Sequence, residues 1–401
     1  MIIQPKVRGF ICTTAHPTGC HQTVLQQVNY VKKQAKLKGP MNVLIIGAST
    51  GYGLASRIVA TFGADAKTIG VFFEKEADEK RTASAGWYNT AAFEKIAHKE
   101  GHYAKSINGD AFSNEIKEQT VKLIRKDLGK IDLIIYSLAS PRRVHPNTGH
   151  VYSSVLKPIG QSYTSKTVDT FKEEVKEITL EAATPSEIEN TIAVMGGEDW
   201  EMWVSLLLKE NLLAEGVKTV AYSYVGPTLT HPIYKNGTIG KAKEDLLKVS
   251  KKITAQLSDL HGEALISVNK GLVTQASAAI PVVPLYISLI YKLMKAKGTH
   301  EGCIEQMERL FRDNLYSKSN RMNLDDEGQI RLDDFEMEPE LQRQIAATWP
   351  RLTTENLKEN TDIEGYREEF YRLFGFHYDN VNYETDVDPN VGIESIETIS
   401  S

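Results

Sequence analysis

Two side chains in the second half of the chain, Tyr234 and Lys243, could act together on an oxygen atom that gains negative charge during a reaction. A phenol hydroxyl can donate a hydrogen bond to such an oxygen as the charge appears, which stabilises the transition state more than the ground state. A nearby ammonium group is expected to lower the pKa of the phenol from its usual value of about 10. Tyr224 could supply a second phenol to the same substrate. Each tyrosine could instead be a packing residue, and Lys241 competes with Lys243 for the cationic role.

The spacing of this pair sets a structural condition. In one continuous helix, residues nine positions apart would lie on opposite faces, because each step turns the chain by about 100°. Tyr234 and Lys243 can therefore converge only if a helix begins between them. The dipeptide Asn236-Gly237 and Gly240 supply the break, since they are turn residues and poor helix-interior residues. We expect Tyr234 on the preceding loop and Lys243 in the first turns of the helix, with Thr238 or Gly240 near the N-cap.

A glycine-rich segment occurs much earlier, directly after a predicted buried strand and at the start of a predicted helix. It reads Gly-Ala-Ser-Thr-Gly-Tyr-Gly from position 47 to position 53, a G-x-x-x-G-x-G spacing that resembles short-chain dehydrogenases. Glycines let the backbone approach a pyrophosphate closely, and the amides at a helix N-terminus attract its charge. An ordinary strand-to-helix turn is the alternative. The residues predicted to bind a dinucleotide here are Gly47, Ala48, Ser49, Thr50, Gly51 and Tyr52.

Further cofactor positions follow from strand order, since ligands bind beyond the carboxyl ends of parallel strands. Glu74 closes the second strand, where an acidic residue binds the adenosine ribose hydroxyls and repels a 2′-phosphate. NADH should therefore be preferred over NADPH, unless Glu74 only forms a solvated pair with Lys75. Asp110-Ala111 is expected beside the adenine, and Leu138-Ala139 beside the nicotinamide ribose.

Short apolar runs alternate with segments of helical period, a pattern typical of βαβ units around a parallel sheet. The predicted strands are 43–46, 68–73, 103–107, 132–136, 219–224 and 264–268. The predicted helices are 53–63, 87–100, 113–127, 198–214 and 241–259. The sequence thus indicates an α/β protein with a Rossmann-type, doubly wound parallel sheet.

Three segments exceed a minimal nucleotide-binding unit. Residues 1–40 suggest a short strand and a helix around 22–37, residues 141–185 are polar and could form a β appendage or a lid, and residues 298–401 are acidic and mostly helical, with a hairpin near 325–332. We expect one elaborated domain over 1–401, with a nucleotide-binding and catalytic core at 41–275, the inserted segment at 141–185 and a helical C-terminal extension at 276–401.

The bulk composition narrows the class of protein. The 401 residues are 41% hydrophobic and 25% charged, which is typical of a soluble globular protein, and the net charge of −5 argues against a nucleic-acid binder. Cys12, Cys20 and Cys303 show no C-x-x-C spacing, so we expect reduced thiols and no metal site. No signal peptide and no membrane-spanning apolar run are visible. A cytoplasmic protein without membrane insertion is expected.

Several longer stretches are more distinctive than the glycine-rich loop. They are Ala15-His16-Pro17 with Gly19-Cys20, Ala85-Gly86-Trp87-Tyr88-Asn89, Tyr136-Ser137-Leu138-Ala139-Ser140-Pro141-Arg142, Val194-Met195-Gly196-Gly197-Glu198-Asp199-Trp200 and Val268-Asn269-Lys270-Gly271-Leu272-Val273-Thr274. With the Tyr-x8-Lys pair, these stretches make essentially the whole chain resemble the FabV-type enoyl-acyl-carrier-protein reductases and the trans-2-enoyl-CoA reductases.

This resemblance implies an activity: NADH-dependent reduction of the trans-2 double bond of enoyl thioesters, carried on acyl carrier protein or on CoA, as the reductive step of fatty acid synthesis. It implies Tyr234 as proton donor and Tyr224 as a substrate contact. The cofactor contacts that it implies are Lys243, Leu272, Val273, Thr274, Phe73, Glu74, Asp110, Ala111, Leu138 and Ala139. The resemblance also implies a monomer, and although a flavin label is sometimes attached to the C-terminal part of the family, nothing in this chain requires a flavin.

Some alternatives stay open at this stage. A short-chain-type carbonyl or alcohol oxidoreductase and a non-catalytic NAD(H)-binding module are the competing functions. Residues 279–287 could form a wall of the acyl pocket or only the start of a core helix. His231 is a weak candidate for a general base, and Trp200 and Trp203 are expected in the core. The side chains that could meet the phosphates of the acyl carrier, or simply be solvated, are Arg142, Arg143, Lys157 and Lys166.

Overall fold

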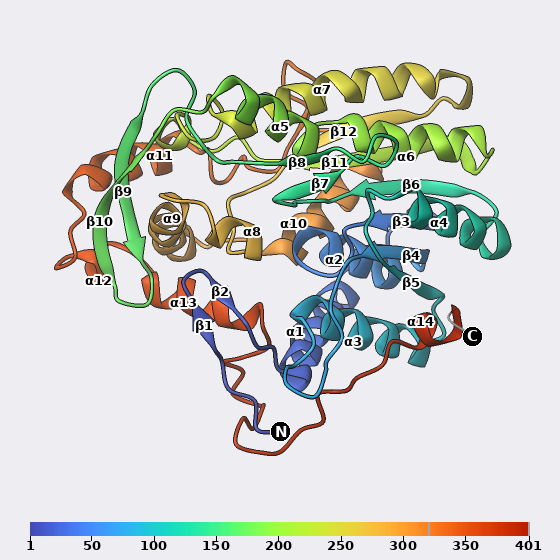
Figure 1. The fold of residues 1–401 in the computed structure, drawn as a ribbon, viewed down its shortest axis with the longest axis horizontal. Coiled ribbons are helices and arrows are strands. Elements are labelled where there is room, and N and C mark those ends of the chain that lie inside the picture. The colour runs from blue at the N-terminus through green and yellow to red at the C-terminus, as the bar shows by residue number, and fades with distance from the viewer. Residues whose placement is uncertain (320, 400–401) are drawn as a thin grey trace.

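A seven-stranded parallel sheet forms the centre of the protein, in a computed structural model that describes residues 1–319 and 321–399 (Figure 1). Its strand order is β13-β12-β11-β6-β3-β4-β5. The strands are β3 (Asn42–Ile46), β4 (Lys67–Phe72), β5 (Ala104–Asn108), β6 (Ile131–Tyr136), β11 (Leu213–Ser223), β12 (Glu263–Val268) and β13 (Ile330–Arg331). The chain runs outward from β3 to β5, returns to β6 beside β3 and then runs outward the other way. The predicted doubly wound topology is confirmed, and it places a ligand crevice between β3 and β6.

The central strands are apolar along their whole length because helices cover both faces of the sheet. In β3, Val43 and Ile45 pack against one layer of helices, while Leu44 and Ile46 pack against the other. The first layer holds α1 (Pro17–Lys32), α2 (Gly51–Ile58), α3 (Ala85–Lys99) and α10 (Cys303–Arg309), and the second holds α4 (Asn114–Asp127), α6 (Glu198–Lys209) and α7 (Thr238–Gln256). Trp200 and Trp203 lie fully buried in the second layer, which confirms that they belong to the core.

The predicted helices exist, with differences at their ends. The helix expected over 198–214 ends at Lys209, because Asn211 adopts a left-handed φ of 55° and Leu213 already pairs with Ile131 as the start of β11. The helix expected over 53–63 is α2 followed by a π-helical turn, Val59–Gly63. The seventh strand, β13, was not predicted: it is only two residues long and pairs with β12. It lies within the hairpin predicted near 325–332, where Leu324 and Ile330 form an isolated antiparallel bridge.

The N-terminal and inserted segments add small β structures to the sheet. Before α1, β1 (Val7–Arg8) and β2 (Ile11–Cys12) form a short ribbon. Residues 141–185 contain two antiparallel pairs, β7 (Arg142–Val144) with β8 (Val151–Ser153) and β9 (Tyr163–Asp169) with β10 (Glu174–Leu180), before α5 (Pro185–Met195). These pairs agree with the β appendage, one of the two alternatives considered for this segment.

The C-terminal extension is mostly helical, as predicted. Its helices are α8 (Gln275–Ala278), α9 (Val283–Lys297), α10, a π-helical turn Leu310–Leu315, α11 (Pro339–Thr348), α12 (Leu357–Asn360), α13 (Ile363–Arg372) and α14 (Glu394–Ile399). Figure 1 shows its last part passing beside the N-terminus on the way to α14. The Trp87 indole donates to the Val391 carbonyl, and the Tyr88 hydroxyl donates to the Pro389 carbonyl. The tail is therefore fastened to α3 of the nucleotide-binding half.

Cys12, Cys20 and Cys303 are all free thiols. Within residues 1–319 and 321–399, no helix has the length and apolarity needed to cross a membrane. In the same residues, no group of three or more His, Cys, Asp or Glu side chains is arranged to hold a metal ion.

Candidate active site

The glycine-rich loop lies at the switch between β3 and β6, where the doubly wound topology predicts a ligand crevice. Gly47 has a φ of 90°, and a Cβ atom at this position would stand 2.1 Å from the Ser137 carbonyl oxygen. The loop can therefore pass under the end of β6 only with glycine here. Thr50 caps α2 without a side-chain hydrogen bond, which leaves the first amides of this helix available to an anion.

A cavity of about 860 Å³ opens over this loop. It gathers most of the residues that sequence analysis assigned to the cofactor: Gly47, Ser49, Thr50, Gly51, Tyr52, Phe73, Glu74, Asp110, Ala111, Leu138, Ala139, Val273 and Thr274. Ala48 and Leu272 are buried beside it and do not line it, and neither does Lys243. Segments from four strand ends and from the stretch after β12 therefore meet around one cavity large enough for an extended cofactor.

Glu74 points back toward the glycine-rich loop. Its Oε1 atom accepts a hydrogen bond of 2.7 Å from the Ser49 hydroxyl, and burial raises the pKa of its carboxyl group above the ordinary value. Lys75 is exposed, and among the ion pairs of the described residues none joins it to Glu74. The arrangement favours the ribose-binding role over a solvated Glu–Lys pair. The neighbouring Phe73 is 75% exposed at the cavity rim, which is unusual for a large apolar side chain.

Asn89 is a cavity residue to which sequence analysis gave no role. Its side-chain amide donates to the Ser49 carbonyl at 3.3 Å, whereas its Oδ1 atom is buried and accepts no hydrogen bond from any described residue. A buried acceptor of this kind is costly unless a ligand satisfies it. The orphaned oxygen and the glycine cradle together fit a bound dinucleotide. The sequence signal that could have identified Asn89 is a polar residue within the apolar start of α3.

The two candidate tyrosines lie together beyond the carboxyl end of β11. Their rings meet edge to face, with centroids 4.8 Å apart and planes at 86°. The Tyr224 hydroxyl donates to Glu336, whereas the Tyr234 hydroxyl makes no hydrogen bond to a described residue and is free to meet a ligand. Burial, and then the charge of Glu336, raise the pKa of Tyr234 to about 12. The prediction that a neighbouring ammonium lowers this pKa is therefore wrong.

Lys243 occupies the first turns of α7, as the break between the two residues predicted. Helix α7 starts at Thr238 with Gly237 at its N-cap. The Lys243 ammonium donates to the Tyr222 carbonyl at 3.0 Å and not to Tyr234, and burial lowers its pKa to about 8. Lys241 instead pairs with Glu244 on the exposed surface. The structure thus turns Lys243 toward β11 and leaves Lys241 outside.

The loop that carries Tyr234 is fixed to α7 by a close backbone contact. A Cβ atom on Gly240 would lie 1.9 Å from the Lys235 carbonyl oxygen and 2.7 Å from that of Tyr234. The inserted segment also binds the start of α7: the Thr238 amide donates to the Lys157 carbonyl, and the Thr238 hydroxyl donates to the Val155 carbonyl. The position of Tyr234 therefore depends on a glycine and on the insertion.

Glu336 is the residue that sequence analysis missed most completely. It comes from the C-terminal extension, is fully buried and accepts hydrogen bonds from the hydroxyls of Tyr224 and Tyr286 and from the Gly271 amide. Its sequence neighbourhood, an acidic stretch between a short strand and a helix, gave no sign of this contact. Only the three-dimensional fold brings it beside the end of β12.

Comparison with known proteins now decides the family. Residues 81–316, more than half of the chain, match a family model described as the trans-2-enoyl-CoA reductase catalytic region. The chain belongs to the trans-2-enoyl-CoA reductase family. Residues 2–79 match a model described as the NAD(P)H binding domain of trans-2-enoyl-CoA reductase, and residues 324–387 match one described as an enoyl reductase FAD binding domain.

Relatives of this reductase family match along their full length. A trans-2-enoyl-CoA reductase [NADH] of Ruminiclostridium cellulolyticum is 58% identical, over 99% of this chain and 100% of its own length. An enoyl-[acyl-carrier-protein] reductase [NADH] of Coxiella burnetii is 62% identical, over 99% of this chain and 98% of its own length. The Clostridium acetobutylicum trans-2-enoyl-CoA reductase solved in complex with NADH has a TM-score of 0.94 and 45% identity, covering 97% of this chain and 98% of that one.

The flavin-related description of the family does not match the arrangement of residues 324–387, all of which the structure describes. A flavin dinucleotide needs a phosphate-binding turn, usually glycine-rich and at a helix N-terminus after a strand. The strand here, β13, is followed by Leu332-Asp333-Asp334, which contains no glycine and does not open a helix, since α11 begins only at Pro339. Asp333 forms an ion pair with Arg331, and Asp334 forms an ion pair with Arg309. Within residues 324–387, β13 is thus not followed by a phosphate-binding turn of this kind.

The cationic side chains suggested for the acyl carrier are mostly engaged in this reductase. Arg143 is buried against Glu198, Lys157 pairs with Glu187, and Lys166 donates to the carbonyls of Pro350 and Leu352. Arg142 remains exposed and lines the rim of the large cavity. Arg142 is therefore the member of this group that could meet a carrier phosphate.

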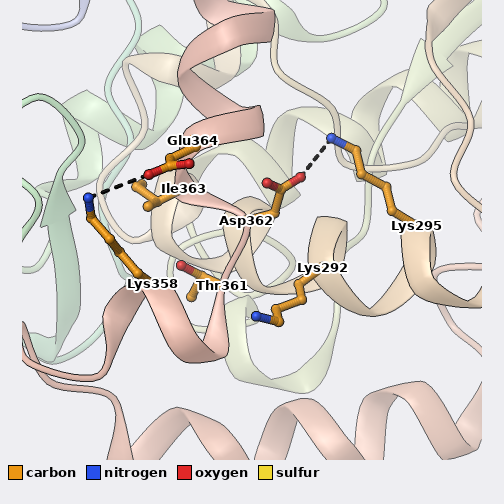
Figure 2. Close-up of a pocket in the computed structure, with 7 residues that line it drawn as sticks. All are labelled: Lys292, Lys295, Lys358, Thr361, Asp362, Ile363 and Glu364. Carbon is orange, nitrogen blue, oxygen red and sulfur yellow. Dashed lines mark hydrogen bonds and ion pairs between the residues drawn. The ribbon is translucent and has the colours of Figure 1, made fainter.

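Other candidate features serve the packing of the fold. A cleft of about 350 Å³ between α9, α12 and α13 contains three lysines (Figure 2). Lys295 pairs with Asp362, Lys358 pairs with Glu173 and Glu364, and Lys292 donates to the Glu359 carbonyl. All three cations are thus matched by carboxylate or carbonyl oxygens.

His231 is half-buried against the Gly226 carbonyl, and burial lowers its pKa. Residues 279–287 lie largely in the buried core.

Proposed function

We propose that this chain reduces the C2–C3 double bond of trans-2-enoyl thioesters with NADH. The observation that carries this proposal is the position of Tyr234. Its unbonded hydroxyl lies next to Tyr224 at the carboxyl end of β11, and β11 pairs with β6, whose carboxyl end lines the cavity predicted for the dinucleotide. Relatives at about 60% identity carry names that include both the enoyl substrate and NADH.

The residues of this chain would hold the dinucleotide in sections. The glycine-rich loop and the free amides of α2 would bind the pyrophosphate, and Glu74 the adenosine ribose, while Leu138, Ala139 and the 272–274 segment would contact the nicotinamide half. When bound, the reduced nicotinamide supplies the hydride that adds to C3. The carboxylate of Glu74 disfavours the additional phosphate of NADPH.

Tyr234 would act on the oxygen of the thioester. With a pKa near 12 its phenol is protonated at neutral pH, so it can donate a hydrogen bond to the enolate oxygen that develops as C3 is reduced. Tyr224 would contact the same substrate. The Lys243 ammonium would bind the nicotinamide ribose, since its pKa of about 8 keeps it largely protonated near pH 7. C2 then takes a proton from Tyr234 or from an ordered water, which balances the two-electron reduction.

We also propose that NADH acts directly, without a flavin between it and the substrate. The absence of a phosphate-binding turn in residues 324–387 supports this, as does the use of one of their buried carboxylates, Glu336, in hydrogen bonds to tyrosines. We further propose that the enzyme works as a cytoplasmic monomer, on substrates carried by acyl carrier protein, by CoA or by both, and that no metal takes part.

The test is the consumption of NADH by the purified protein. We expect crotonyl-CoA to oxidise NADH and acetoacetyl-CoA not to do so, and matched crotonyl-CoA and crotonyl-carrier-protein substrates would then rank the two carriers. Turnover with acetoacetyl-CoA alone would point to a carbonyl oxidoreductase. NADH binding without turnover on any enoyl substrate would point to a non-catalytic module.

A further inference from the structure

Glu336 is a carboxylate with no exposed surface, surrounded by groups from three other parts of the chain. Its Oε1 atom accepts the hydroxyls of Tyr224, at 3.0 Å, and Tyr286, at 2.7 Å. Its Oε2 atom accepts the Gly271 amide at 2.7 Å. Tyr224 follows β11, Gly271 follows β12, and Tyr286 lies in α9. One side chain of the C-terminal extension therefore joins the ends of two sheet strands to a helix.

Burying the Glu336 carboxylate costs free energy, and this cost explains why hydrogen-bond donors surround it. A buried charge is tolerated only when it is hydrogen-bonded and balanced. Burial raises the pKa of the Glu336 carboxyl group, whereas the nearby Lys270 ammonium and the hydrogen bonds from Gly271 and Tyr286 oppose this shift and favour the charged form. Since hydrogen bonds to a charged acceptor are shorter and stronger than neutral ones, the Tyr224 hydroxyl has little freedom to rotate away.

The same contact reaches the cofactor cavity along the chain. Gly271 immediately precedes Leu272-Val273-Thr274, and Val273 and Thr274 line the cavity. The Val273 amide donates to the Tyr291 hydroxyl, which donates in turn to Glu369. Glu336 thus fixes the start of the 271–274 segment through Gly271, and Tyr291 of α9 fixes its middle through Val273. The same Glu336 side chain also binds Tyr224, so the segment and Tyr224 are positioned together.

We propose that Glu336 is a positioning residue for the reduction: it orients the Tyr224 phenol beside Tyr234 and holds the Gly271 backbone, so that substrate contact and cofactor segment stay in register. The role rests on the proposed function, in which Tyr224 contacts the substrate. It gives residues 324–387 a part in catalysis that needs no flavin. Glu336 itself acts through its hydrogen bonds with Tyr224, Tyr286 and Gly271, and it does not touch the reacting atoms.

A double-mutant cycle separates this role from simple structural support. Glu336→Gln keeps the size of the side chain but removes an acceptor, because an amide offers one oxygen where the carboxylate offers two. We expect kcat with crotonyl-CoA to fall about tenfold in the Tyr224-containing enzyme, and by no more than about twofold when Tyr224→Phe is already present. An equal loss in both backgrounds would overturn the proposal, because damage to the fold alone does not depend on the Tyr224 hydroxyl.

Glu94→Gln provides a matched control. Glu94 is also buried, and it accepts two hydroxyls, from Ser106 and Ser395, and one amide, from Ser395, at a place remote from the tyrosines. We expect its loss of stability to equal or exceed that of Glu336→Gln, with kcat within about twofold of wild type. A loss of kcat that follows stability in both variants would contradict a positioning role.

A readout independent of turnover keeps the inference testable if the enoyl activity itself is absent. In protein labelled with 3-fluorotyrosine, the fluorine resonance assigned through Tyr224→Phe should shift in Glu336→Gln and stay in place in Glu94→Gln. If Glu336→Gln does not fold, Tyr286→Phe, which removes the other phenol from the same oxygen, should shift the Tyr224 resonance instead. A Tyr224 resonance that stays in place would refute the proposal. Failure of the proposed function would appear separately, as wild-type protein that binds NADH without reducing crotonyl-CoA.

Discussion

At the scale of single residues, Tyr234 is the side chain whose loss should be most informative. Tyr234→Phe removes a hydroxyl that has no partner in the described residues, so the folded protein loses no internal hydrogen bond. We expect kcat to fall at least about tenfold while the Kd for NADH changes little, because the lost hydrogen bond acts in the transition state. Steady-state kinetics and fluorescence titration measure the two quantities. Tyr103→Phe, which loses a hydroxyl bonded to Asp127, is the matched control, and an unchanged kcat in Tyr234→Phe would remove the assigned role.

Glu74 determines a second prediction, on the choice of cofactor. Its carboxylate is bonded to Ser49 beside the cavity, where the extra phosphate of NADPH would meet a negative charge. Glu74→Ala should raise kcat/KM for NADPH by about tenfold and lower that for NADH, because repulsion is removed and a ribose partner is lost. Glu76→Ala removes an equal charge two residues away on the exposed surface. If both variants keep the wild-type preference, Glu74 does not contact the ribose.

Burial of Lys243 gives the binding of NADH a specific pH dependence. Its ammonium is charged below a pKa of about 8 and neutral above it, so the ribose contact should weaken as the pH rises through this value. Lys270 also has a pKa lowered to about 8 by burial, so a substitution is needed to assign the step. In Lys243→Met we expect weaker NADH binding at every pH and no step near pH 8, whereas Lys241→Met should retain the step. Titrations of Kd between pH 6 and pH 10 would decide, and a step that persists in Lys243→Met would assign it to another group.

At the scale of elements, Gly240 ties the loop of Tyr234 to the first turn of α7. In a helix interior alanine is more favourable than glycine by about 1 kcal/mol, so propensity alone predicts that Gly240→Ala stabilises the protein. The contact of 1.9 Å with the Lys235 carbonyl predicts the opposite, since the added methyl group must displace the loop. We expect a lower Tm and a lower kcat, measured by thermal unfolding and by turnover. Lys241→Ala should change neither, and a stabilised, fully active Gly240→Ala would show that the loop can move freely.

The sequence predicted long, regular elements well because burial on both faces leaves a continuous apolar run, as in β3 and β6. From the turn residues Asn236-Gly237 and Gly240 it predicted a break before α7, but it expected the helix over 241–259 with Thr238 or Gly240 near the N-cap, whereas α7 starts at Thr238 with Gly237 as its N-cap. It failed where tertiary contacts decide: the end of α6 depends on the backbone of Asn211, and β13 has only two residues, too few to show a period. Within the site, residues next to strand ends could be found from topology. Glu336 could not, because its partners are at least 50 residues away along the chain, from Tyr286 at a separation of 50 to Tyr224 at a separation of 112.

At the scale of the whole molecule, the three matched family regions share one sheet. Strands β3 and β4 fall in residues 2–79, β5, β6, β11 and β12 in residues 81–316, and β13 in residues 324–387. The last segment also returns to α3 through the Trp87 and Tyr88 hydrogen bonds. A boundary at any of these limits would cut hydrogen-bonded neighbours within the sheet. We therefore propose that residues 1–401 form one elaborated domain, with the cavity at its centre.

A single domain has a thermodynamic signature. Because NADH is proposed to bind only the native protein, it should stabilise the whole unit by RT ln(1 + [L]/Kd), about 2.7 kcal/mol at a concentration of 100 times Kd. For a protein of this length the shift in Tm is about 3 °C. Calorimetry should show one transition that moves as a whole with NADH and much less with an equal concentration of NADPH. Two transitions, of which only the one containing residues 1–79 moved, would show that the nucleotide-binding part unfolds independently of the extension that supplies Glu336.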